Sequence, residues 1–284
     1  MTSALAQAKI NLVFQVAGLG EDGYHEVRSI YQALELQERV TVSKSDSWQV
    51  EVLGDVPGIE NAPRDQSNIV VRAAVALATA AGISNPQPMR FVIEKQIPVE
   101  GGMAGGSADA AAALVALNEA WCLGLSEREL LRVGATLGAD VPFALFGGTA
   151  FGTGTGTELE RLQSLDTHFV LLVFSPSGLS TKAVFEEFDR IRPAGDQLDL
   201  DAENYLHRLG ENSLSAAALS LMPSLESVMR VDCGIPGGFI SGSGPTVWFT
   251  DKNEEKVMAA QKIFQALGYK TLVTKTSPFG ARLD

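Results

Sequence analysis

Residues 98 to 108 read P-V-E-G-G-M-A-G-G-S-A, a composition suited to binding an anion. Glycine and alanine leave the backbone open to a close ligand, and glycine also reaches positive φ at little cost. The segment leads into residues 107–110, S-A-D-A, where we expect a helix to start. A helix N-terminus presents unpaired N–H groups and the positive end of the helix dipole. We therefore expect this loop to bind an anion, most simply a nucleotide phosphate.

The common phosphate-loop patterns do not describe this segment. The Walker pattern needs a Gly-Lys pair, which the sequence lacks. A dinucleotide pattern begins at Gly152 and Gly154 but fails at Thr157, where the third glycine would stand. This argues against an NAD-dependent oxidoreductase. A flexible strand-to-helix connection remains the alternative interpretation of residues 98–108.

A lysine and an asparagine lie on one face of the first predicted strand. Residues 8 to 16, A-K-I-N-L-V-F-Q-V, alternate with the period of two that is typical of a strand. Lys9 and Asn11 therefore share a face. Lys9 is either a solvated edge residue, as most lysines are, or a fixed positive charge that projects into a site.

Asp140 stands among apolar residues in L-G-A-D-V-P-F, just after a helix that we expect to end near Gly138. Its side chain can cap a following short helix with Pro142 in the first turn. A carboxylate in apolar surroundings near a glycine loop is also typical of a catalytic aspartate. The sequence alone leaves both interpretations open.

An aromatic ring and an imidazole follow a turn near the N-terminus. Residues 21 to 26 read E-D-G-Y-H-E, and Asp22-Gly23 marks the turn. Tyr24 and His25 can lie on the surface of that turn, or they can stack on a base or a sugar.

The elements that must position these residues mix strands and helices without steady alternation, which indicates an α+β fold in two lobes. We expect helices over 68–81, 107–121, 126–138, 180–188 and 254–267. We expect a hairpin of 41–44 with 48–53, and further strands over 89–95, 168–174, 238–241, 246–250 and 269–275. The pattern resets near residues 163–168, so we divide the chain into domains 1–163 and 164–284.

Charge and cysteine content restrict the class of protein. The 284 residues carry a formal net charge of −12, which argues against nucleic acid and anionic membranes as partners. Cys122 and Cys233 lie far apart, with neither metal-ligand spacing nor a disulfide framework, which suits a reducing cytosol. We find no signal-peptide pattern and no apolar run of membrane-spanning length, so we expect a cytoplasmic protein.

Taken together, the motifs resemble the GHMP family of small-molecule kinases, named for galactose, homoserine, mevalonate and phosphomevalonate kinases. The matching segments are A-K-I-N-L (8–12), D-G-Y-H-E (22–26), P-x-x-x-G-M-A-G-G-S-A-D (98–109), L-G-A-D-V-P (137–142) and S-G-S-G-P-T-V-W-F (241–249). The segments occur in the family's order, and together they span most of the chain. The resemblance implies an S5-like N-terminal lobe, a ferredoxin-like C-terminal lobe, a site between them, and ATP with Mg²⁺ as cofactors.

The resemblance also implies roles for individual residues. Asp140 would accept the proton of the substrate hydroxyl, and Lys9 would lie beside it and offset charge on the transferring phosphoryl group. The residues implied in ATP binding are Asn68, Lys95, Pro98, Val99, Glu100, Gly101, Gly102, Met103, Ala104, Gly105, Gly106, Ser107 and Ala108. The residues implied in substrate binding are Asn11, Tyr24, His25, Thr181 and Phe185, and residues 241–245 would close the site.

Within the family, D-G-Y-H and G-A-D-V-P are similar to the members that phosphorylate a cytidine diphosphate alcohol in the non-mevalonate isoprenoid pathway. Phe185 would then stack on the cytosine. The alternatives are a kinase for another small alcohol, homoserine or mevalonate, and a catalytically inactive nucleotide-binding member. We expect a small-molecule partner, no nucleic acid, no membrane, and a monomer or weak homodimer.

Two residues depart from the family pattern. Ala104 stands where many members have glycine, which costs about 1 kcal/mol if that position needs positive φ. Ala108 stands where many members have a second serine, so one hydroxyl contact is missing. No acidic ligand for Mg²⁺ is evident besides Asp140, so the metal ligands stay unassigned.

Overall fold

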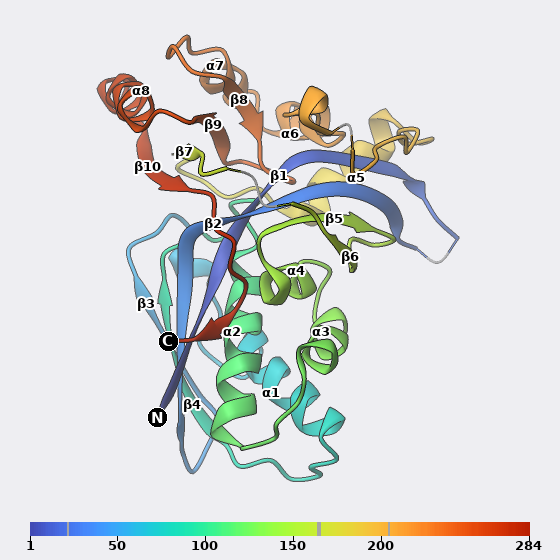
Figure 1. Ribbon diagram of the computed structural model, residues 1–284, viewed down its shortest axis with the longest axis vertical. Helices are drawn as coiled ribbons and strands as arrows, with labels where there is room; N and C mark the ends of the chain where they lie inside the picture. Colours follow the sequence, from blue (N-terminus) through green and yellow to red (C-terminus); the bar gives the residue numbers. More distant parts are fainter. Residues whose placement is uncertain (22, 164–165, 204) are drawn as a thin grey trace.

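A pair of long antiparallel strands, β1 (Thr2–Leu19) and β2 (His25–Lys44), runs from the lower lobe into the upper lobe (Figure 1). The computed structural model describes residues 1–284 except 22, 164, 165 and 204. The strand expected at residues 8–16 is thus the middle of a longer β1. The register of the pair shifts between Gln7 and Lys9 and again between Asn11 and Val13, so irregular backbone flanks the Lys9–Asn11 segment.

The first sheet has the order β11-β1-β2-β4-β3, and β5 pairs with β2 and with β6. Its remaining strands are β3 (Gln49–Gly54), β4 (Met89–Lys95), β5 (Thr149–Thr153), β6 (Glu158–Arg161) and β11 (Arg282–Leu283). The hairpin predicted from residues 41–44 and 48–53 is wrong. The chain does reverse there, but β4 lies between β2 and β3, antiparallel to β2 and parallel to β3. Turn residues indicate a reversal of direction, whereas the neighbour of a strand is chosen by distant sequence.

The helices of the first lobe are α1 (Ile69–Ala80), α2 (Gly105–Ala120), α3 (Glu127–Ala135) and α4 (Val141–Phe146), with a short 3-10 helix η1 (Ile59–Asn61) before them. Helix α2 contacts β1, β2, α1 and α4. All of its alanines except the last, Ala120, are buried, which is the pattern of a helix enclosed in a core, and their small side chains allow close packing. Ser126 and Glu129 form a capping box at the start of α3, within the helix expected over 126–138.

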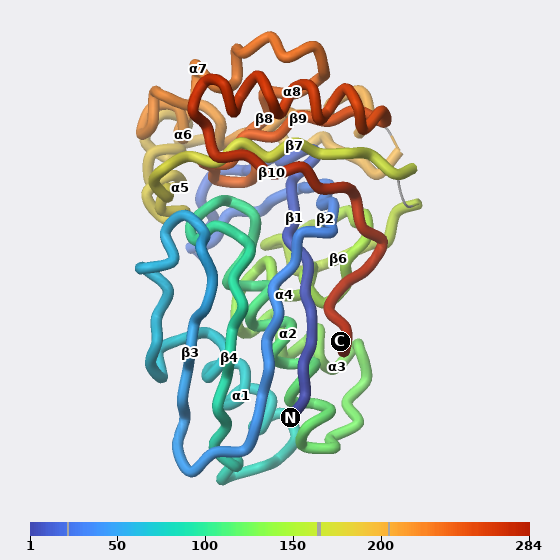
Figure 2. Tube along the Cα trace, turned by 90° about the vertical axis from the view of Figure 1, so that its left-hand side faces the viewer, coloured from blue at the N-terminus to red at the C-terminus, as the bar shows by residue number. Residues whose placement is uncertain are grey.

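The second lobe contains a sheet of order β10-β7-β9-β8, in which every neighbouring pair is antiparallel. Its strands are β7 (Phe169–Phe174), β8 (Gly237–Ile240), β9 (Val247–Asp251) and β10 (Lys270–Lys275). Its helices are α5 (Thr181–Ile191), η2 (Tyr205–Arg208), α6 (Ser215–Leu221), α7 (Leu225–Met229) and α8 (Glu254–Ala266). This strand order is that of a ferredoxin-like lobe, so the α+β, two-lobed prediction is confirmed. Figure 2 shows this lobe stacked on the first.

The lobes are joined by more than the connection in the middle of the chain. The C-terminal strand β11 returns to the first sheet, where Leu283 pairs with Ala4 of β1. The predicted domain boundary falls at residues 164 and 165, which lie outside the described residues, and the division stays a prediction. In the part of the chain that the structure describes, no helix has the length and apolar character needed to cross a bilayer.

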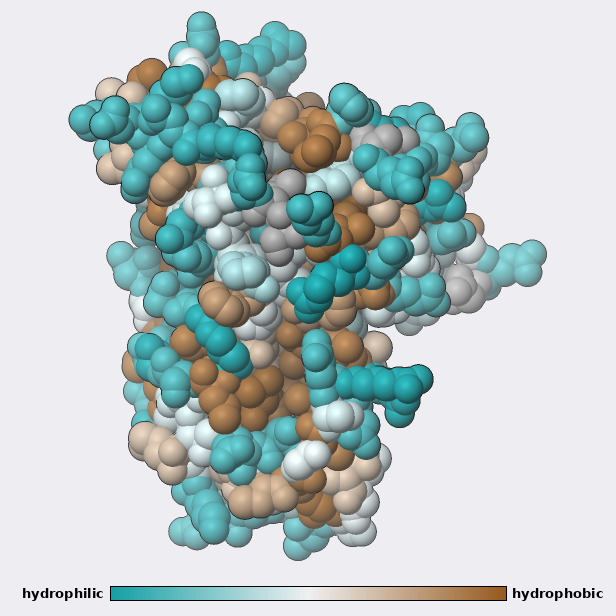
Figure 3. All heavy atoms as spheres, in the orientation of Figure 1, coloured by the Kyte–Doolittle hydropathy of each residue, from teal (hydrophilic) through white to brown (hydrophobic). Residues whose placement is uncertain are grey.

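The visible surfaces of the lobes differ in character. Figure 3 shows mostly hydrophilic residues over the upper lobe, whereas apolar residues gather below the middle of the molecule. A cavity of about 410 Å³ on the first lobe is lined by residues of α2, α3 and α4 and by the segment 278–282. It is separate from the cavities that contain the predicted site residues.

Candidate active site

Lys9 is a buried lysine whose ammonium is held in place by its neighbours. Lys9 is only 5% exposed, so it is not a solvated edge residue. Its Nζ donates to Asn11 Oδ1 at 2.7 Å, which confirms that the two side chains share a face. Asn11 Nδ2 in turn donates to Ser29 Oγ at 2.7 Å, and Ser29 donates to the Val13 carbonyl. This chain of hydrogen bonds fixes the position of the positive charge.

Asp140 faces that ammonium from the start of α4. Its Oδ2 lies 3.6 Å from Lys9 Nζ, and its side chain is 32% exposed. The carboxylate makes no capping hydrogen bond to α4, although the backbone occupies the capping position. The interpretation of Asp140 as a side-chain cap is therefore wrong, and the carboxylate remains available to a ligand.

Tyr31 forms the floor beneath this ion pair. Lys9 Nζ lies 5.6 Å from the centroid of the Tyr31 ring, and that ring stacks on Phe143 at 4.9 Å between centroids. Burial, together with the nearby Asp140 carboxylate, raises the pKa of the Tyr31 hydroxyl well above its usual range. Tyr31 therefore stays neutral and supplies a rigid wall.

The glycine loop forms the wall of a cavity of about 370 Å³. The cavity is lined by most of the residues predicted to bind ATP: Asn68, Lys95, Pro98, Val99, Glu100, Gly101, Gly102, Ala104, Gly105 and Gly106. Met103 and Ala108 are buried in the core instead, and Ser107 is half-buried in the first turn of α2. The loop also contacts β1 directly, because the Lys9 N–H donates to the Met103 carbonyl at 3.2 Å.

Tyr24, His25 and Phe185 line a second cavity of about 640 Å³, which Asp140 also lines. The rings of His25 and Phe185 lie 5.0 Å apart, and His25 Nε2 lies 2.8 Å from Asp189 Oδ1. Since Phe185 and Asp189 belong to α5, both lobes build this cavity. Tyr24 is 65% exposed at its rim. The structure thus brings three of the predicted substrate residues together beside Asp140.

The other predicted substrate residues lie elsewhere. Asn11 is bound to Lys9, as described above. Thr181 lines the smaller, glycine-loop cavity, where its Oγ1 lies 3.0 Å from Ser243 Oγ. Its contact with a substrate stays a prediction.

Residues 241–245 of the second lobe cover the glycine loop and Lys9. Ser241 Oγ donates to the Gly102 carbonyl at 2.9 Å. A Cβ on Gly102 would collide with the Ser241 carbonyl oxygen, and a Cβ on Gly242 would lie 3.3 Å from Lys9 Nζ. Glycine is required where these loops approach each other so closely.

Comparisons with known proteins show which family the chain belongs to. Residues 68–148 match the N-terminal domain of the GHMP kinases. The 4-diphosphocytidyl-2-C-methyl-D-erythritol kinase of Nocardia farcinica is 42% identical over 98% of this chain and 94% of its own length. The chain belongs to the GHMP kinase family.

Other relatives extend the comparison within the GHMP kinases. The enzyme of the same name from Mycobacterium tuberculosis (strain H37Rv) is 43% identical over 85% of this chain and 79% of its own. A crystal structure of 4-(cytidine 5'-diphospho)-2C-methyl-D-erythritol kinase has a TM-score of 0.76 at 29% identity, covering 97% of this chain and 99% of that one. A homoserine kinase from Cytophaga hutchinsonii shares the fold, with a TM-score of 0.72 at 18% identity over 100% of this chain and 97% of that one.

Ala104 departs from the GHMP kinase pattern at a position that does need the left-handed conformation. Its φ is 60° and its ψ is 33°, directly before the first residue of α2. Helix α2 therefore begins at Gly105, two residues earlier than predicted. Gly105 and Gly106 of its first turn line the glycine-loop cavity.

The sequence analysis missed a buried charge cluster next to this GHMP kinase loop. Lys95 Nζ lies 2.6 Å from Glu38 Oε1 and 2.8 Å from Asp109 Oδ2. Glu38 also accepts hydrogen bonds from the N–H groups of Gln96 and Ile97, where the loop begins. Asp109 lies in the first turns of α2, where the loop ends. One cluster therefore holds both ends of the glycine loop.

The environment of this cluster shifts the pKa of each member. Burial raises the pKa of Glu38 to about 7 and also raises the pKa of Asp109. Burial lowers the pKa of Lys95, but the Asp109 and Glu38 carboxylates outweigh it and raise that pKa to about 12. Lys95 thus remains charged. A single glutamate within a strand pattern gave no signal of this, because its partners come from β4 and α2.

Proposed function

We propose that the protein transfers the γ-phosphate of ATP to the 2-hydroxyl of 4-diphosphocytidyl-2-C-methyl-D-erythritol, in the non-mevalonate isoprenoid pathway. The observation that carries this proposal is the position of Asp140. It lines the larger cavity and pairs with Lys9, which lies directly beneath the loops around the smaller cavity. The Nocardia farcinica relative of this name matches 98% of the chain.

In this function the glycine loop binds the ATP phosphates. The first-turn N–H groups of α2 and the positive end of its dipole stabilise negative charge. The protein carries a net charge of −12, so the positive potential at the site must be local. Lys9 and the helix N-terminus supply it. Asn68, which caps α1, and the side of the Lys95 stem line the adenosine end of the cavity.

Asp140 acts as the base. It accepts the proton of the 2-hydroxyl as the oxygen attacks the γ-phosphorus and the bond to the β-γ bridging oxygen breaks, which releases ADP. Lys9 lies 3.6 Å from the carboxylate and offsets the charge that spreads over the transferring group. The hydrogen bond to Asn11 keeps the ammonium at that point through the reaction.

Magnesium is a second requirement of this reaction class, because it neutralises charge on the phosphates. Oxygen atoms are the ligands that Mg²⁺ prefers. The fitting oxygens are the Asp140 carboxylate, which makes no capping bond, and the Ser107 hydroxyl in the first turn of α2. The described residues contain no cluster of three His, Cys, Asp or Glu side chains, so phosphate and water oxygens would complete the coordination.

The cytidine end of the acceptor occupies the larger cavity. Phe185 and Tyr24 present aromatic faces there, and stacking on aromatic rings is a general mode of base recognition. His25 supplies a polar ring whose orientation is fixed by Asp189. Because ATP is the donor, we place the reaction in the cytoplasm; a monomer or weak homodimer stays a prediction.

The first test is an acceptor panel with purified protein and Mg-ATP: 4-diphosphocytidyl-2-C-methyl-D-erythritol, homoserine, mevalonate and no alcohol. We expect ADP release with the cytidyl alcohol alone. Release with a different alcohol would keep the chemistry of Lys9 and Asp140 but contradict the assignment of Tyr24, His25 and Phe185. Tight nucleotide binding without release in any sample would indicate an inactive, nucleotide-binding member.

A further inference from the structure

Residues 210–213 of the second lobe are hydrogen-bonded along β1, the strand that carries Lys9 and Asn11. The Gly210 N–H donates to the Leu12 carbonyl at 2.8 Å. The Phe14 N–H donates to the Glu211 carbonyl at 2.8 Å, and the Ser213 N–H donates back to the Phe14 carbonyl at 2.9 Å. This segment therefore has a fixed position relative to the catalytic lysine.

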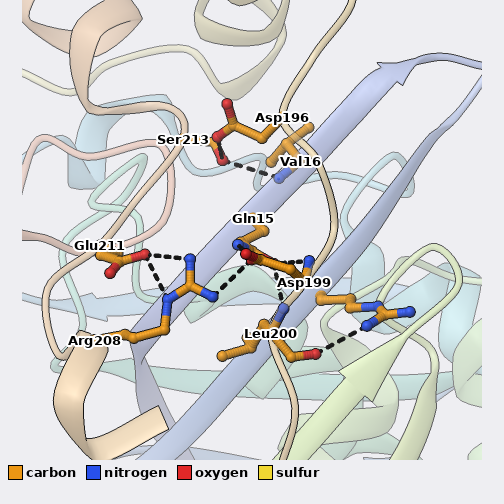
Figure 4. Close-up of polar contacts among 9 residues, drawn as sticks. Gln15, Val16, Asp196, Asp199, Leu200, Arg208, Glu211 and Ser213 are labelled. Atoms are coloured by element: carbon orange, nitrogen blue, oxygen red, sulfur yellow. Dashed lines mark hydrogen bonds and ion pairs between the residues drawn. The ribbon is translucent and has the colours of Figure 1, made fainter. Parts of the chain in front are cut away.

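A polar network holds the same segment from its outer side (Figure 4). Ser213 Oγ accepts from the Val16 N–H at 3.0 Å, and Ser213 donates to Asp196. Arg208 bridges the exposed carboxylates of Asp199 and Glu211. Gln15 Nε2 of β1 donates to Asp199 Oδ1 at 2.7 Å. The segment is thus fastened to β1 by backbone and side-chain bonds together.

Asn212 lies in the middle of this segment and reaches in the opposite direction. Its Nδ2 donates to the carbonyls of Ile240 and Gly242, at 3.0 and 2.8 Å. Its Oδ1 accepts from the Leu214 N–H at 2.9 Å. Both amide hydrogens are therefore used on the two carbonyls that flank Ser241.

The loop that Asn212 holds is the one that covers the reacting groups. Ser241 donates to the Gly102 carbonyl of the glycine loop. A Cβ added to Gly242 would lie 3.3 Å from both Lys9 Nζ and Asn11 Oδ1, which is tighter than ordinary van der Waals contact. A displacement of residues 241–242 would change the space above Lys9 and the support of the glycine loop.

We propose that Asn212 is a positioning residue for phosphoryl transfer. It ties residues 241–245 to β1, so that this loop, the glycine loop and Lys9 keep one relative geometry. The proposal rests on the proposed kinase function for its kinetic consequence but not for the tie itself. If Asn212 served only the local turn, its important bond would be the one that Oδ1 accepts from the Leu214 N–H. Its loss would then lower the stability of the protein without a specific effect on kcat.

The test variant is Asn212→Ser, because serine can still accept from the Leu214 N–H but cannot reach both carbonyls. Asn118 offers a matched control. Its Nδ2 donates to the Leu125 carbonyl and its Oδ1 accepts from the Leu125 N–H, both at 3.0 Å, in the connection between α2 and α3. Asn118→Ser therefore removes a comparable amide-to-backbone bond, in a connection that lines neither site cavity.

We expect Asn212→Ser to lower kcat about tenfold or more, since a displacement of about 1 Å at a reacting centre can cost of the order of 100-fold. Hydrogen exchange in residues 241–246 should become faster. Acceptor affinity, measured without nucleotide, should change less than about twofold, because the Tyr24–His25–Phe185 cavity does not involve this loop. Asn118→Ser should leave kcat within about twofold of the wild type even where its melting temperature falls equally.

Unchanged hydrogen exchange in residues 241–246 would show that Asn212 does not hold this loop on β1. Faster exchange with kcat near the wild-type value would overturn its catalytic importance, and a parallel loss of acceptor affinity would indicate general loosening instead. Should Asn212→Ser not fold, Ser241→Ala tests the same geometry from the loop side and should also lower kcat. If the wild type phosphorylates no alcohol in the panel, the exchange measurement still decides the tie.

Discussion

Asp140 and Lys9 lie near opposite ends of the first lobe's sequence, and the proposed phosphoryl transfer needs both side chains. The substitution Asp140→Asn keeps the shape of the side chain but removes the proton acceptor. We expect kcat to fall by roughly 10²- to 10⁴-fold, the usual contribution of a general base. The KM for ATP should change much less than kcat, because the glycine loop, which would bind the phosphates, is unaltered. Turnover within a few-fold of the wild type would remove Asp140 from the role of base.

Glu38 gives a prediction about pH. Its pKa in the folded protein is about 7, above the ordinary value of 4.5, because burial and the nearby Asp109 carboxylate raise it more than the Lys95 ammonium lowers it. A raised folded pKa contributes stability that is complete below the unfolded pKa and is lost as the pH rises through the folded pKa. Wild-type stability should therefore fall, relative to Glu38→Gln, between about pH 4.5 and 7.

Urea unfolding of both proteins at several pH values within this window measures the difference directly. A constant difference between wild type and Glu38→Gln would show that Glu38 does not titrate in the window. Asp109 is the other carboxylate that faces Lys95, and its pKa is raised too. Wild-type stability should therefore also fall with rising pH relative to Asp109→Asn.

At the scale of elements, the start of α2 contains a strained residue. Ala104 has φ of 60°, which costs an alanine roughly 1–2 kcal/mol, whereas glycine adopts it freely at an entropic cost of roughly 0.4–1 kcal/mol. We expect Ala104→Gly to leave stability unchanged or raise it by up to about 1 kcal/mol. The control Ala120→Gly, in the last turn of the same helix, should lower stability by about 1 kcal/mol. Equal losses in both variants, measured by thermal unfolding, would contradict the strain.

Local sequence was sufficient for elements whose signals lie within themselves. The capping box of α3, the Asn68 cap of α1 and the glycine loop before α2 depend on residues a few positions apart. Strand pairing does not, and the false hairpin shows this: nothing in residues 41–53 indicates that β4 will lie between their strands. The Glu38–Lys95–Asp109 cluster was missed for the same reason, since it exists only after β2, β4 and α2 meet.

At the scale of the whole molecule, the larger cavity, which we propose for the acceptor, is built from both lobes. His25 begins β2 in the first lobe, and its ring is held by Asp189 and packed on Phe185, both from α5 of the second lobe. Asp189→Ala should therefore raise the KM for the cytidyl acceptor by roughly tenfold, the effect of losing a hydrogen bond worth about 1.5 kcal/mol. The KM for ATP should stay the same, because the glycine-loop cavity contains neither His25 nor Asp189.

The exposed Glu186, on the same helix, provides the control for this substitution. It pairs only weakly with Lys182 at 3.7 Å in solvent, so Glu186→Ala should leave both KM values unchanged. Steady-state kinetics with each substrate varied in turn separates the two effects. Equal rises in the KM for ATP and for the acceptor in Asp189→Ala would mean that the residue supports the contact between the lobes in general. A selective rise for the acceptor would mean that the inter-lobe hydrogen bond between His25 and Asp189, rather than either lobe alone, sets the affinity for the cytidine end.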